Sequence, residues 1–123
     1  MPNASIISIV DDDASVREGL ADLVSSMGYQ AKTFRRPRHF LNSHWLRKTS
    51  CLIADVQMPE MTGLELCAAV ADLGIKMPTI LITAFPNNDD RDRARGVGVS
   101  YLVKPFKKGE LIKCIRSTLE HTV

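Results

Sequence analysis

The sequence predicts a five-stranded, doubly wound α/β domain built on a parallel sheet with five helices. The chain has 123 residues, which is the usual size of one domain. Hydrophobic residues make up 45% of it and charged residues 24%, as in ordinary globular proteins. Short apolar runs alternate with longer helical patterns along the chain, and such alternation forms right-handed crossovers that cover both faces of a parallel sheet. We therefore expect residues 1–123 to form a single domain.

The first predicted strand and helix lie before Gly28. Residues 5–10 are rich in β-branched side chains, which is typical of a buried parallel strand. Apolar residues then recur at the spacing of one helix face; they are Val16, Leu20, Leu23, Val24 and Met27. Asp13 or Ser15 can cap the start of this helix, and Gly28 can end it.

The second strand and helix are predicted between Gln30 and Lys48. Residues 30–34 form a short strand. Residues 37–48 follow as a helix, because Pro37 suits a first helical turn. The expected apolar side of this helix consists of Phe40, Leu41 and Trp45.

The second half of the chain is predicted to contain three more strand–helix pairs. The strands are residues 50–54, followed by Asp55, then residues 79–83 and 100–103. The third helix, around Leu66, stops near Gly74, and the fifth begins near Lys107. The fifth is expected to bury Leu111, Ile112, Ile115 and Leu119. The fourth, over residues 87–98, has only Ala94 and Val97 to bury, which suits an element that shifts and equally an exposed helix.

The composition argues against a membrane or secreted protein. No apolar run approaches the ~18–20 residues of a membrane span, and the N-terminus does not resemble a secretory signal. The three scattered cysteines suit buried thiols in a reducing compartment; they are Cys51, Cys67 and Cys114. We therefore expect a cytoplasmic location.

The charges are unevenly distributed. Between Asp22 and Asp55 there is no acidic residue, while basic residues gather at Lys32, Arg35, Arg36, Arg38, Arg47 and Lys48. A solvated basic face explains this bias, and a docking surface for an acidic partner or a flanking domain is the alternative. No aromatic interleaving or motif favours binding of nucleic acid by this domain.

Residues with chemical function follow four of the predicted strands. They are Asp11 and Asp12 after the first strand, Asp55 after the third, Thr83 at the end of the fourth and Lys104 after the fifth. Functional groups of doubly wound sheets gather at the carboxyl ends of strands. Crowded carboxylates need a cation, and hard oxygen ligands favour Mg²⁺. A carboxylate nucleophile with Mg²⁺, a hydroxyl and a lysine is suited to phosphoryl transfer.

With these residues in place, the sequence resembles the receiver domains of two-component response regulators. The matching segments are residues 9–13, Asp55 to Pro59 with Thr62 and Gly63, residues 81–84, and residues 101–106. The order and spacing of these segments agree across nearly the whole chain. The resemblance implies the flavodoxin-like strand order 2-1-3-4-5, of which a receiver protein is a known example. It also implies a cis Lys104–Pro105 peptide bond.

The resemblance also assigns roles to individual residues. Asp55 would accept a phosphoryl group from the phosphohistidine of a sensor histidine kinase. Mg²⁺ would be held by Asp12, Asp55 and the main-chain carbonyl of Gln57, with Asp11 assisting mostly through water. Thr83 and Lys104 would bind phosphoryl oxygens. Thr83 and Tyr101 would act as the switch, with Tyr101 turning inward.

The resemblance further predicts how a phosphorylated domain would work. Phosphorylation would shift the population of conformers and so control an output domain or partner, most simply in transcription. The surface of the fourth helix, fifth strand and fifth helix is expected to serve dimerisation or docking. A C-terminal DNA-binding domain, absent from this chain, is one expected output, and a single-domain regulator is the alternative. We also hypothesise that Gln57 and Phe85 set the lifetime of the acyl phosphate. Catalysis would be limited to self-catalysed phosphotransfer and autodephosphorylation.

Three rival interpretations are weaker. A haloacid-dehalogenase-like phosphatase would use Asp11 and Asp13 as an Asp-x-Asp pair, but then no acidic pair follows Lys104 and Asp55 has no role. A degenerate receiver that only binds is disfavoured because all the site residues are present. Flavin binding lacks the phosphate-binding loop after the first strand.

Overall fold

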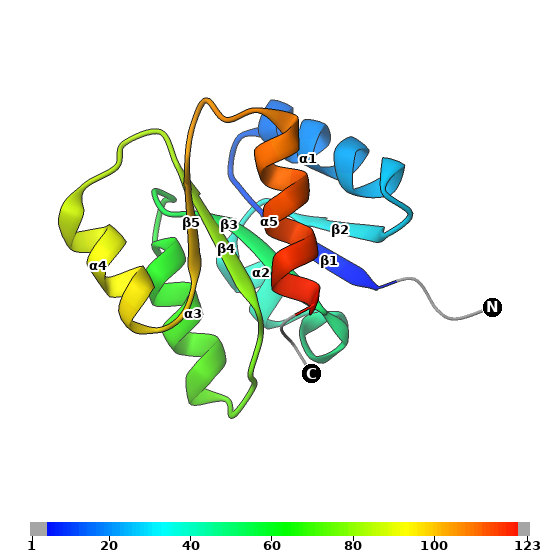
Figure 1. Ribbon diagram of the computed structural model, residues 1–123. Helices are drawn as coiled ribbons and strands as arrows, with labels where there is room; N and C mark the ends of the chain where they lie inside the picture. Colours follow the sequence, from blue (N-terminus) through cyan, green and yellow to red (C-terminus); the bar gives the residue numbers. More distant parts are fainter. Residues whose placement is uncertain (1–4, 121–123) are drawn as a thin grey trace.

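Five parallel strands form one sheet in the order β2-β1-β3-β4-β5. The computed structural model describes residues 5–120 and is drawn in Figure 1. The strands are β1 (Ile6–Val10), β2 (Gln30–Phe34), β3 (Cys51–Asp55), β4 (Thr79–Thr83) and β5 (Ser100–Val103). The helices are α1 (Ala14–Ser26), α2 (Pro37–Leu41), the short 3₁₀ helix η1 (Leu46–Lys48), α3 (Gly63–Asp72), α4 (Asn88–Gly96) and α5 (Lys108–Glu120). The predicted fold class and strand order are confirmed.

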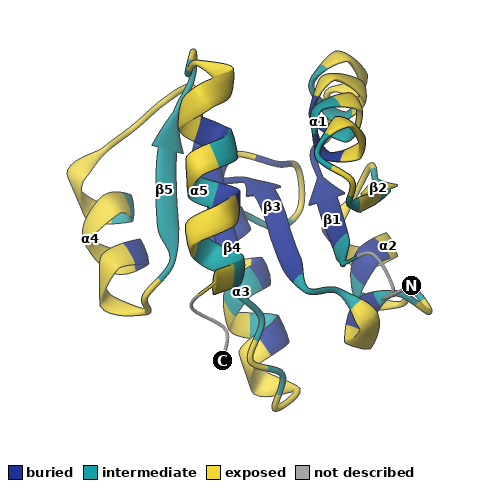
Figure 2. Cartoon of the chain, turned by 45° about the vertical axis from the view of Figure 1, so that its right-hand side comes forward, coloured by how far each residue is buried: buried dark blue, intermediate teal, exposed yellow. Residues whose placement is uncertain are grey.

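Helices cover both faces of the sheet (Figure 1). On one face, α1 and α5 pack through Leu20, Val24, Leu111 and Ile115 against the isoleucines of β1, β3 and β4. On the other face, α2, α3 and α4 pack against Val10, Leu52, Ala54 and Leu81. The central strands are almost fully buried, whereas β5 is half-buried (Figure 2). Each fully buried Ile or Leu side chain contributes about 1.5–3 kcal/mol, so the middle of the sheet is the most firmly held part of the fold.

Local capping explains where several helices begin. Asp13, and not Ser15, caps α1, because its carboxylate accepts hydrogen bonds from the main-chain N–H groups of Ser15 and Val16 at 2.8 and 3.3 Å. Gly28 follows the end of α1 with φ +91°, a left-handed conformation that glycine adopts without strain. Both residues act as the sequence predicted.

Gly63 fixes the position of α3 against the end of β3. A Cβ atom at this position would lie 2.6 Å from the main-chain oxygen of Asp55 and 2.8 Å from a side-chain carbon of Leu81. The Gly63 N–H also donates to the main-chain oxygen of Val56 at 3.0 Å. Only glycine permits this approach, which ties the start of α3 to the strand that ends at Asp55.

The second helix is shorter than predicted. The predicted helix over residues 37–48 is replaced by α2, a turn and η1. Within the turn, the Ser43 hydroxyl donates to the Phe40 carbonyl at 2.8 Å and accepts from the Trp45 N–H at 3.2 Å. These bonds compete with helix continuation. As a consequence Leu46, and not Trp45, is buried in this segment.

The fourth helix is also shorter at its carboxyl end. Ala94 is fully buried as expected, but Val97 is 65% exposed, because α4 ends at Gly96 and Val97 is its cap. In α5, Leu111 and Ile115 are buried while Ile112 and Leu119 are half-buried.

The prediction of a single domain over residues 1–123 extends to residues 1–4 and 121–123, which lie outside the described residues. Within the described residues, no helix is long and apolar enough to cross a membrane.

Candidate phosphoryl-transfer site

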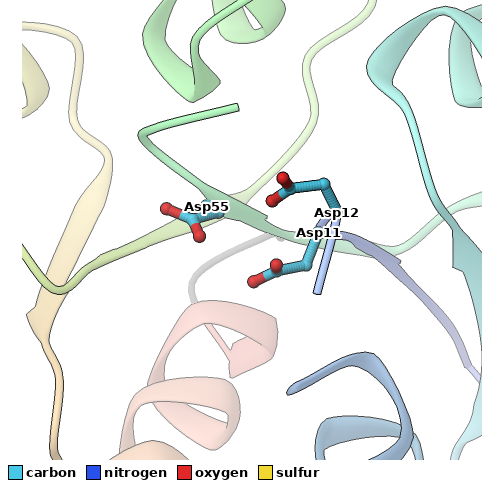
Figure 3. A group of neighbouring side chains, drawn as sticks. All are labelled: Asp11, Asp12 and Asp55. Atoms are coloured by element: carbon cyan, nitrogen blue, oxygen red, sulfur yellow. The ribbon is translucent and has the colours of Figure 1, made fainter. Parts of the chain in front are cut away.

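Three carboxylates meet at the carboxyl ends of β1 and β3. Asp55 is the last residue of β3, and Asp11 and Asp12 directly follow β1, which is its neighbour in the sheet. Each of the three side chains offers an oxygen that lies within 4.8 Å of the others. Figure 3 shows these three side chains at the ends of the two strands. We call these three residues the acidic site. The structure thus brings together the acidic residues that the sequence singled out.

Burial distinguishes the members of the acidic site. Asp11 is fully buried and Asp55 is 8% exposed, whereas Asp12 is exposed. Burial raises the pKa of Asp11. The main-chain N–H of Asp13, which donates to Asp11 at 2.9 Å, and the charge of Lys104 act in the opposite direction. The site therefore holds a carboxylate in surroundings that disfavour its charge.

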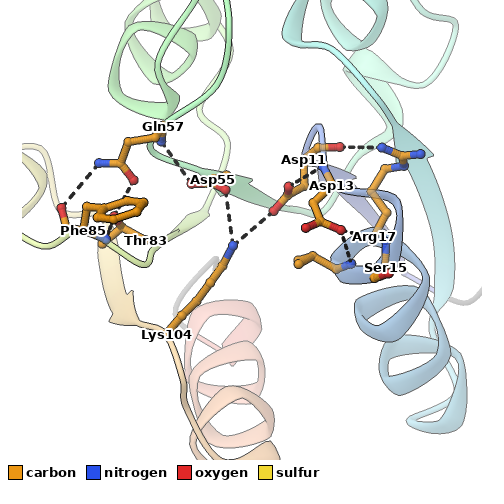
Figure 4. Close-up of polar contacts among 10 residues, drawn as sticks. Asp11, Asp13, Ser15, Arg17, Asp55, Gln57, Thr83, Phe85 and Lys104 are labelled. Atoms are coloured by element: carbon orange, nitrogen blue, oxygen red, sulfur yellow. Dashed lines mark hydrogen bonds and ion pairs between the residues drawn. The ribbon is translucent and has the colours of Figure 1, made fainter.

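Lys104 provides a cation at this site (Figure 4). Its ammonium lies 3.3 Å from Asp55 Oδ2 and 3.6 Å from Asp11 Oδ2. The lysine directly follows β5, where its N–H donates to the Thr83 carbonyl at 2.7 Å. The expected cis Lys104–Pro105 peptide bond is present.

Thr83 forms a small polar network with the loop after β3 (Figure 4). Its hydroxyl donates to Gln57 Oε1 at 2.5 Å and accepts from the Phe85 N–H at 2.9 Å. The Gln57 N–H donates to Asp55 Oδ1 at 3.0 Å, and Gln57 Nε2 donates to the Phe85 carbonyl at 3.5 Å. The loop residue Gln57 therefore connects Asp55 with Thr83.

Tyr101 lies outside the carboxylate cluster. It is paired with Leu81 in the β4–β5 register, two positions before Thr83, so both side chains point to the same face of the sheet. Its hydroxyl is buried without a hydrogen-bond partner, and the guanidinium of Arg91 lies 5.5 Å from its ring centre. Tyr101 is thus placed between the strand that carries Thr83 and the helix α4.

The acidic site is suited to a divalent cation. Asp11 Oδ2 is buried and has no hydrogen-bond partner, which leaves strong acceptor capacity unused. The donors available around it are carboxylate oxygens, the ligands that Mg²⁺ prefers. The donor set therefore fits Mg²⁺, with Asp11, Asp12 and Asp55 as the carboxylates.

Two contacts to the acidic site were not anticipated from the sequence. The sequence predicts Asp13 as a helix cap, and its main-chain N–H in addition donates to the Asp11 carboxylate at 2.9 Å. Arg17 donates to the main-chain oxygen of Asp11 at 2.8 Å from the first turns of α1 (Figure 4). No sequence pattern indicates the Arg17 contact, because it depends on how the loop after β1 folds back on α1.

A cavity of about 660 Å³ lies away from the acidic site. It is found between α3 and α4, where it is lined by Thr79 at the start of β4. Thr83 is at the other end of the same strand. This cavity therefore takes no part in the chemistry of the carboxylates.

Comparisons with known proteins agree with this geometry. Residues 7–116 match the sequence model of the response regulator receiver domain. Response regulator protein TmoT of Ectopseudomonas mendocina is 38% identical over 117 residues, which are 94% of this chain and 53% of that protein. Transcriptional regulatory protein FixJ of Rhizobium meliloti is 32% identical over 118 residues, or 95% of this chain and 58% of that protein. The chain thus spans about half the length of these curated relatives.

Solved structures show the same similarity. The crystal structure of FixJ-N superimposes with a TM-score of 0.85 at 30% identity and covers 100% of this chain and 98% of that one. The structure of response regulator StyR gives a TM-score of 0.87 at 34% identity, covering 95% of this chain and 60% of that one.

Proposed function

We propose, from the premise that this chain belongs to the response regulator receiver family, that Asp55 is its phosphoacceptor. Receivers of this family work in two-component signalling, where they take a phosphoryl group from a sensor histidine kinase. The observation that carries the assignment is the position of Asp55. Asp55 is the last residue of the central strand β3; its Oδ1 accepts from the main-chain N–H of Gln57, and its Oδ2 accepts a hydrogen bond from Lys104 at 3.3 Å, whereas Lys104 lies 3.6 Å from Asp11 Oδ2.

The chain's own residues can perform the transfer as follows. A carboxylate oxygen of Asp55 forms a bond to phosphorus while the bond from phosphorus to the kinase histidine nitrogen breaks, and the electron pair stays on that nitrogen. Lys104 exchanges its contact with Asp55 Oδ2 for a phosphoryl oxygen. The Thr83 hydroxyl leaves Gln57 Oε1 and donates to a second phosphoryl oxygen.

Receivers bind Mg²⁺ at their acidic pocket, and we propose the residues that hold it here. They are Asp11, mostly through water, Asp12, Asp55 and the main-chain carbonyl of Gln57. When bound, Mg²⁺ neutralises charge on the oxygens of the transferred group. Asp11 Oδ2, which is buried and accepts no hydrogen bond, supports this assignment.

The proposed switch consists of Thr83 and Tyr101. Movement of Thr83 toward a phosphoryl group would open space on the face of β4 that Tyr101 shares. The Tyr101 hydroxyl now lacks a partner in a buried place, and an unmet hydrogen bond of this kind costs about 1–3 kcal/mol. A conformer that satisfies this hydroxyl therefore gains stability, which supports Tyr101 as a mobile element.

The partners and context are proposed from the family. The partner upstream is a sensor histidine kinase in the cytoplasm, where its ATP is available. Since TmoT and FixJ are named as regulators and this chain matches only 53% and 58% of their lengths, we propose a C-terminal DNA-binding domain as the output. Residues 1–123 would form one receiver that acts only on its own phosphoryl group. Homodimerisation through α4, β5 and α5 on phosphorylation completes the proposal, and sedimentation with and without beryllofluoride measures it.

The test is to locate the phosphoryl group. The protein is incubated with acetyl phosphate and Mg²⁺, and the modified residue is identified by mass spectrometry. Wild type and Asp22→Asn, an exposed acid on α1, should be modified at Asp55. Asp55→Asn should show no modification while keeping a cooperative thermal transition. Turnover with the phosphoryl group on Asp11 would instead identify a phosphatase, and equal signalling by Asp55→Asn and wild type would identify a binding-only receiver.

Gln57 and Phe85 are proposed to set the lifetime of the acyl phosphate. Gln57 bonds both Thr83 and Phe85, and the Phe85 side chain is 72% exposed beside them. Substitution of either residue by alanine should change the rate at which purified phosphoprotein hydrolyses, since the access of water changes. Unchanged rates across a substitution series at both positions would refute this hypothesis.

A further inference from the structure

We propose that the open edge of the sheet at β2 binds an extended, acidic segment of a partner protein. The surface consists of β2 and the basic residues around it, which we call the basic edge: Lys32, Arg35, Arg36, Arg38, Arg47 and Lys48. It is separate from the acidic site and from the α4–β5–α5 surface. The proposal does not depend on the function of Asp55.

Few acidic side chains pair with the positive charges of the basic edge. No acid occurs between Asp22 and Asp55, so the charges of this segment are all positive. Among the described residues, Arg36 is the one member with an ion pair, to Glu60 at 3.4 Å, and both side chains are about half exposed. Arg35, Arg38, Arg47 and Lys48 are exposed. The surface therefore presents a positive potential that attracts acidic partners.

Two lysines are concentrated on one aromatic ring. The ammonium of Lys32 lies 4.0 Å from the ring centre of Trp45, and that of Lys48 lies 5.8 Å from it. Lys48 also bonds His44 Nε2 at 2.8 Å. Both ammonium groups are within the distance of a cation–π contact. Trp45 thus carries two of the positive charges of the basic edge on its ring.

The main chain of β2 is open on the side away from β1. The N–H of Gln30 donates to the Ser5 carbonyl, and the Phe34 carbonyl accepts from the Asp11 N–H, so both residues turn their peptide groups toward β1. Because these directions alternate along a strand, the peptide groups of Ala31 and Thr33 point outward. In the described part of the chain no strand pairs with this side of β2. These free groups can pair with an added strand.

The combination of features favours a peptide over a nucleic acid. An added strand would satisfy the outward groups of Ala31 and Thr33, which a phosphate backbone cannot do in register. The ring of Trp45 is occupied by Lys32 and Lys48 and is half-buried, so it offers no free face for base stacking. Lysine at an edge also repels basic strands and would lose hydration without compensation beside a neutral one, which leaves acidic strands as suitable partners.

The predicted ligand has a definite pattern. Lys32 shares its face of the sheet with Gln30 and Phe34, since alternate side chains point the same way. An added strand with acids at every second position would place all of them on this face. A blocked peptide of about eight residues that alternates glutamate and valine is therefore the probe.

Titration of the full chain with this probe, followed by amide NMR, tests the proposal. We expect the amide signals of Ala31 and Thr33 to shift, and the affinity to fall as salt rises, because screening shortens the reach of charges from about 30 Å at 0.01 M to about 8 Å at 0.15 M. The double substitution Lys32→Glu with Lys48→Glu should weaken binding on the order of tenfold or more. Lys113→Glu, an exposed lysine on α5, is the matched control and should bind as wild type does.

Two further peptides distinguish the contribution of charge from that of main-chain hydrogen bonds. A glutamine–valine peptide should bind on the order of tenfold more weakly, since it lacks charge. A glutamate–valine peptide with a methyl group on every peptide nitrogen should also bind more weakly, since it cannot donate to β2 from either edge. Equal binding of either probe, unshifted Ala31 and Thr33 signals, or tighter binding of single-stranded DNA through the same amides would overturn the proposal.

Discussion

The acidic site and the basic edge are both clusters of like charges, yet the fold treats them differently. Asp11 and Asp55 are buried at the carboxyl ends of central strands, and Lys104 lies within 3.6 Å of each. The members of the basic edge are mostly exposed around the outer strand β2, and most have no ion pair among the described residues. Water compensates the exposed charges, whereas only protein groups or a bound cation can compensate the buried ones.

This difference connects position to chemistry. A charge in a buried place interacts strongly over short distances, so its partners must be fixed in space. Lys104, the N–H of Gln57 and the N–H of Asp13 are such fixed partners. Exposed charges act more weakly and over a longer range, which suits the attraction of a partner. The comparison predicts that substitutions at the two clusters will have effects of very different size.

The largest effect is expected for Asp11→Asn. Loss of this carboxylate should weaken Mg²⁺ binding by about 10–100-fold, which calorimetric titration measures. Without Mg²⁺ the same variant should unfold at a higher temperature than wild type, because burial disfavours the Asp11 charge. Asp22→Asn should leave both quantities unchanged. A wild-type affinity for Mg²⁺ in Asp11→Asn would contradict the assignment.

The pH dependence of this stability difference has a definite sign. Since the pKa of Asp11 is raised, the folded protein keeps this proton at pH values where the unfolded chain has lost it. The resulting stability is fully present below the ordinary pKa of 3.8 and is lost as the pH rises through the folded pKa. The advantage of Asp11→Asn without Mg²⁺ should therefore be largest near neutral pH and shrink in acid. Urea titrations at several pH values measure it.

A smaller effect is expected for Lys104→Met. Removing this ammonium leaves Asp11 and Asp55 without their nearest cation, and we expect a loss of about 1–3 kcal/mol in Mg²⁺-free buffer. The estimate is below that for a fully buried pair because the Lys104 side chain is 22% exposed. Mg²⁺ should recover part of the loss. Lys113→Met is the matched control, and equal unfolding free energies for the two variants would contradict the role given to Lys104.

The smallest effect is expected at the basic edge. Arg35 is exposed and belongs to the like-charged segment, so Arg35→Gln should change the unfolding free energy by no more than about 0.5 kcal/mol. It should slow association with the acidic probe peptide a few-fold at low salt, as stopped-flow mixing would show. A large loss of stability would mean that fixed protein groups pair with the charge of Arg35, as they do with the charges of the acidic site, and would contradict the comparison.

The sequence allowed different parts of the molecule to be predicted to different degrees. Strands β2, β4 and β5 have the predicted bounds. In β4 and β5 a short apolar run between turn residues leaves little choice. The prediction of one helix over residues 37–48 was wrong, because the Ser43 hydroxyl forms hydrogen bonds with the main chain of Phe40 and Trp45 and the helix does not continue there. Val97 was expected to be buried but caps α4 instead. Helix ends depend on such local bonds more than on periodicity.

For the acidic site, the residue types were predictable and most of their contacts were not. The positions of Asp11, Asp55 and Lys104 after strands follow from the alternation of elements. The bond from Lys104 to Asp55 joins residues 49 positions apart, and it exists only because the sheet order places β5 and β3 on either side of β4. The contact of Arg17 with the Asp11 carbonyl had no sequence signal at all.

The amino-acid sequence by itself determined the alternation of strands and helices and the strand ends at which acids, hydroxyl and lysine stand, because periodicity and turn residues act over neighbouring positions. Only the tertiary structure decided which charges are buried, which are paired and which edge of the sheet stays open. Those properties depend on distances between segments far apart in the chain, and packing of the two helical layers on the sheet sets these distances.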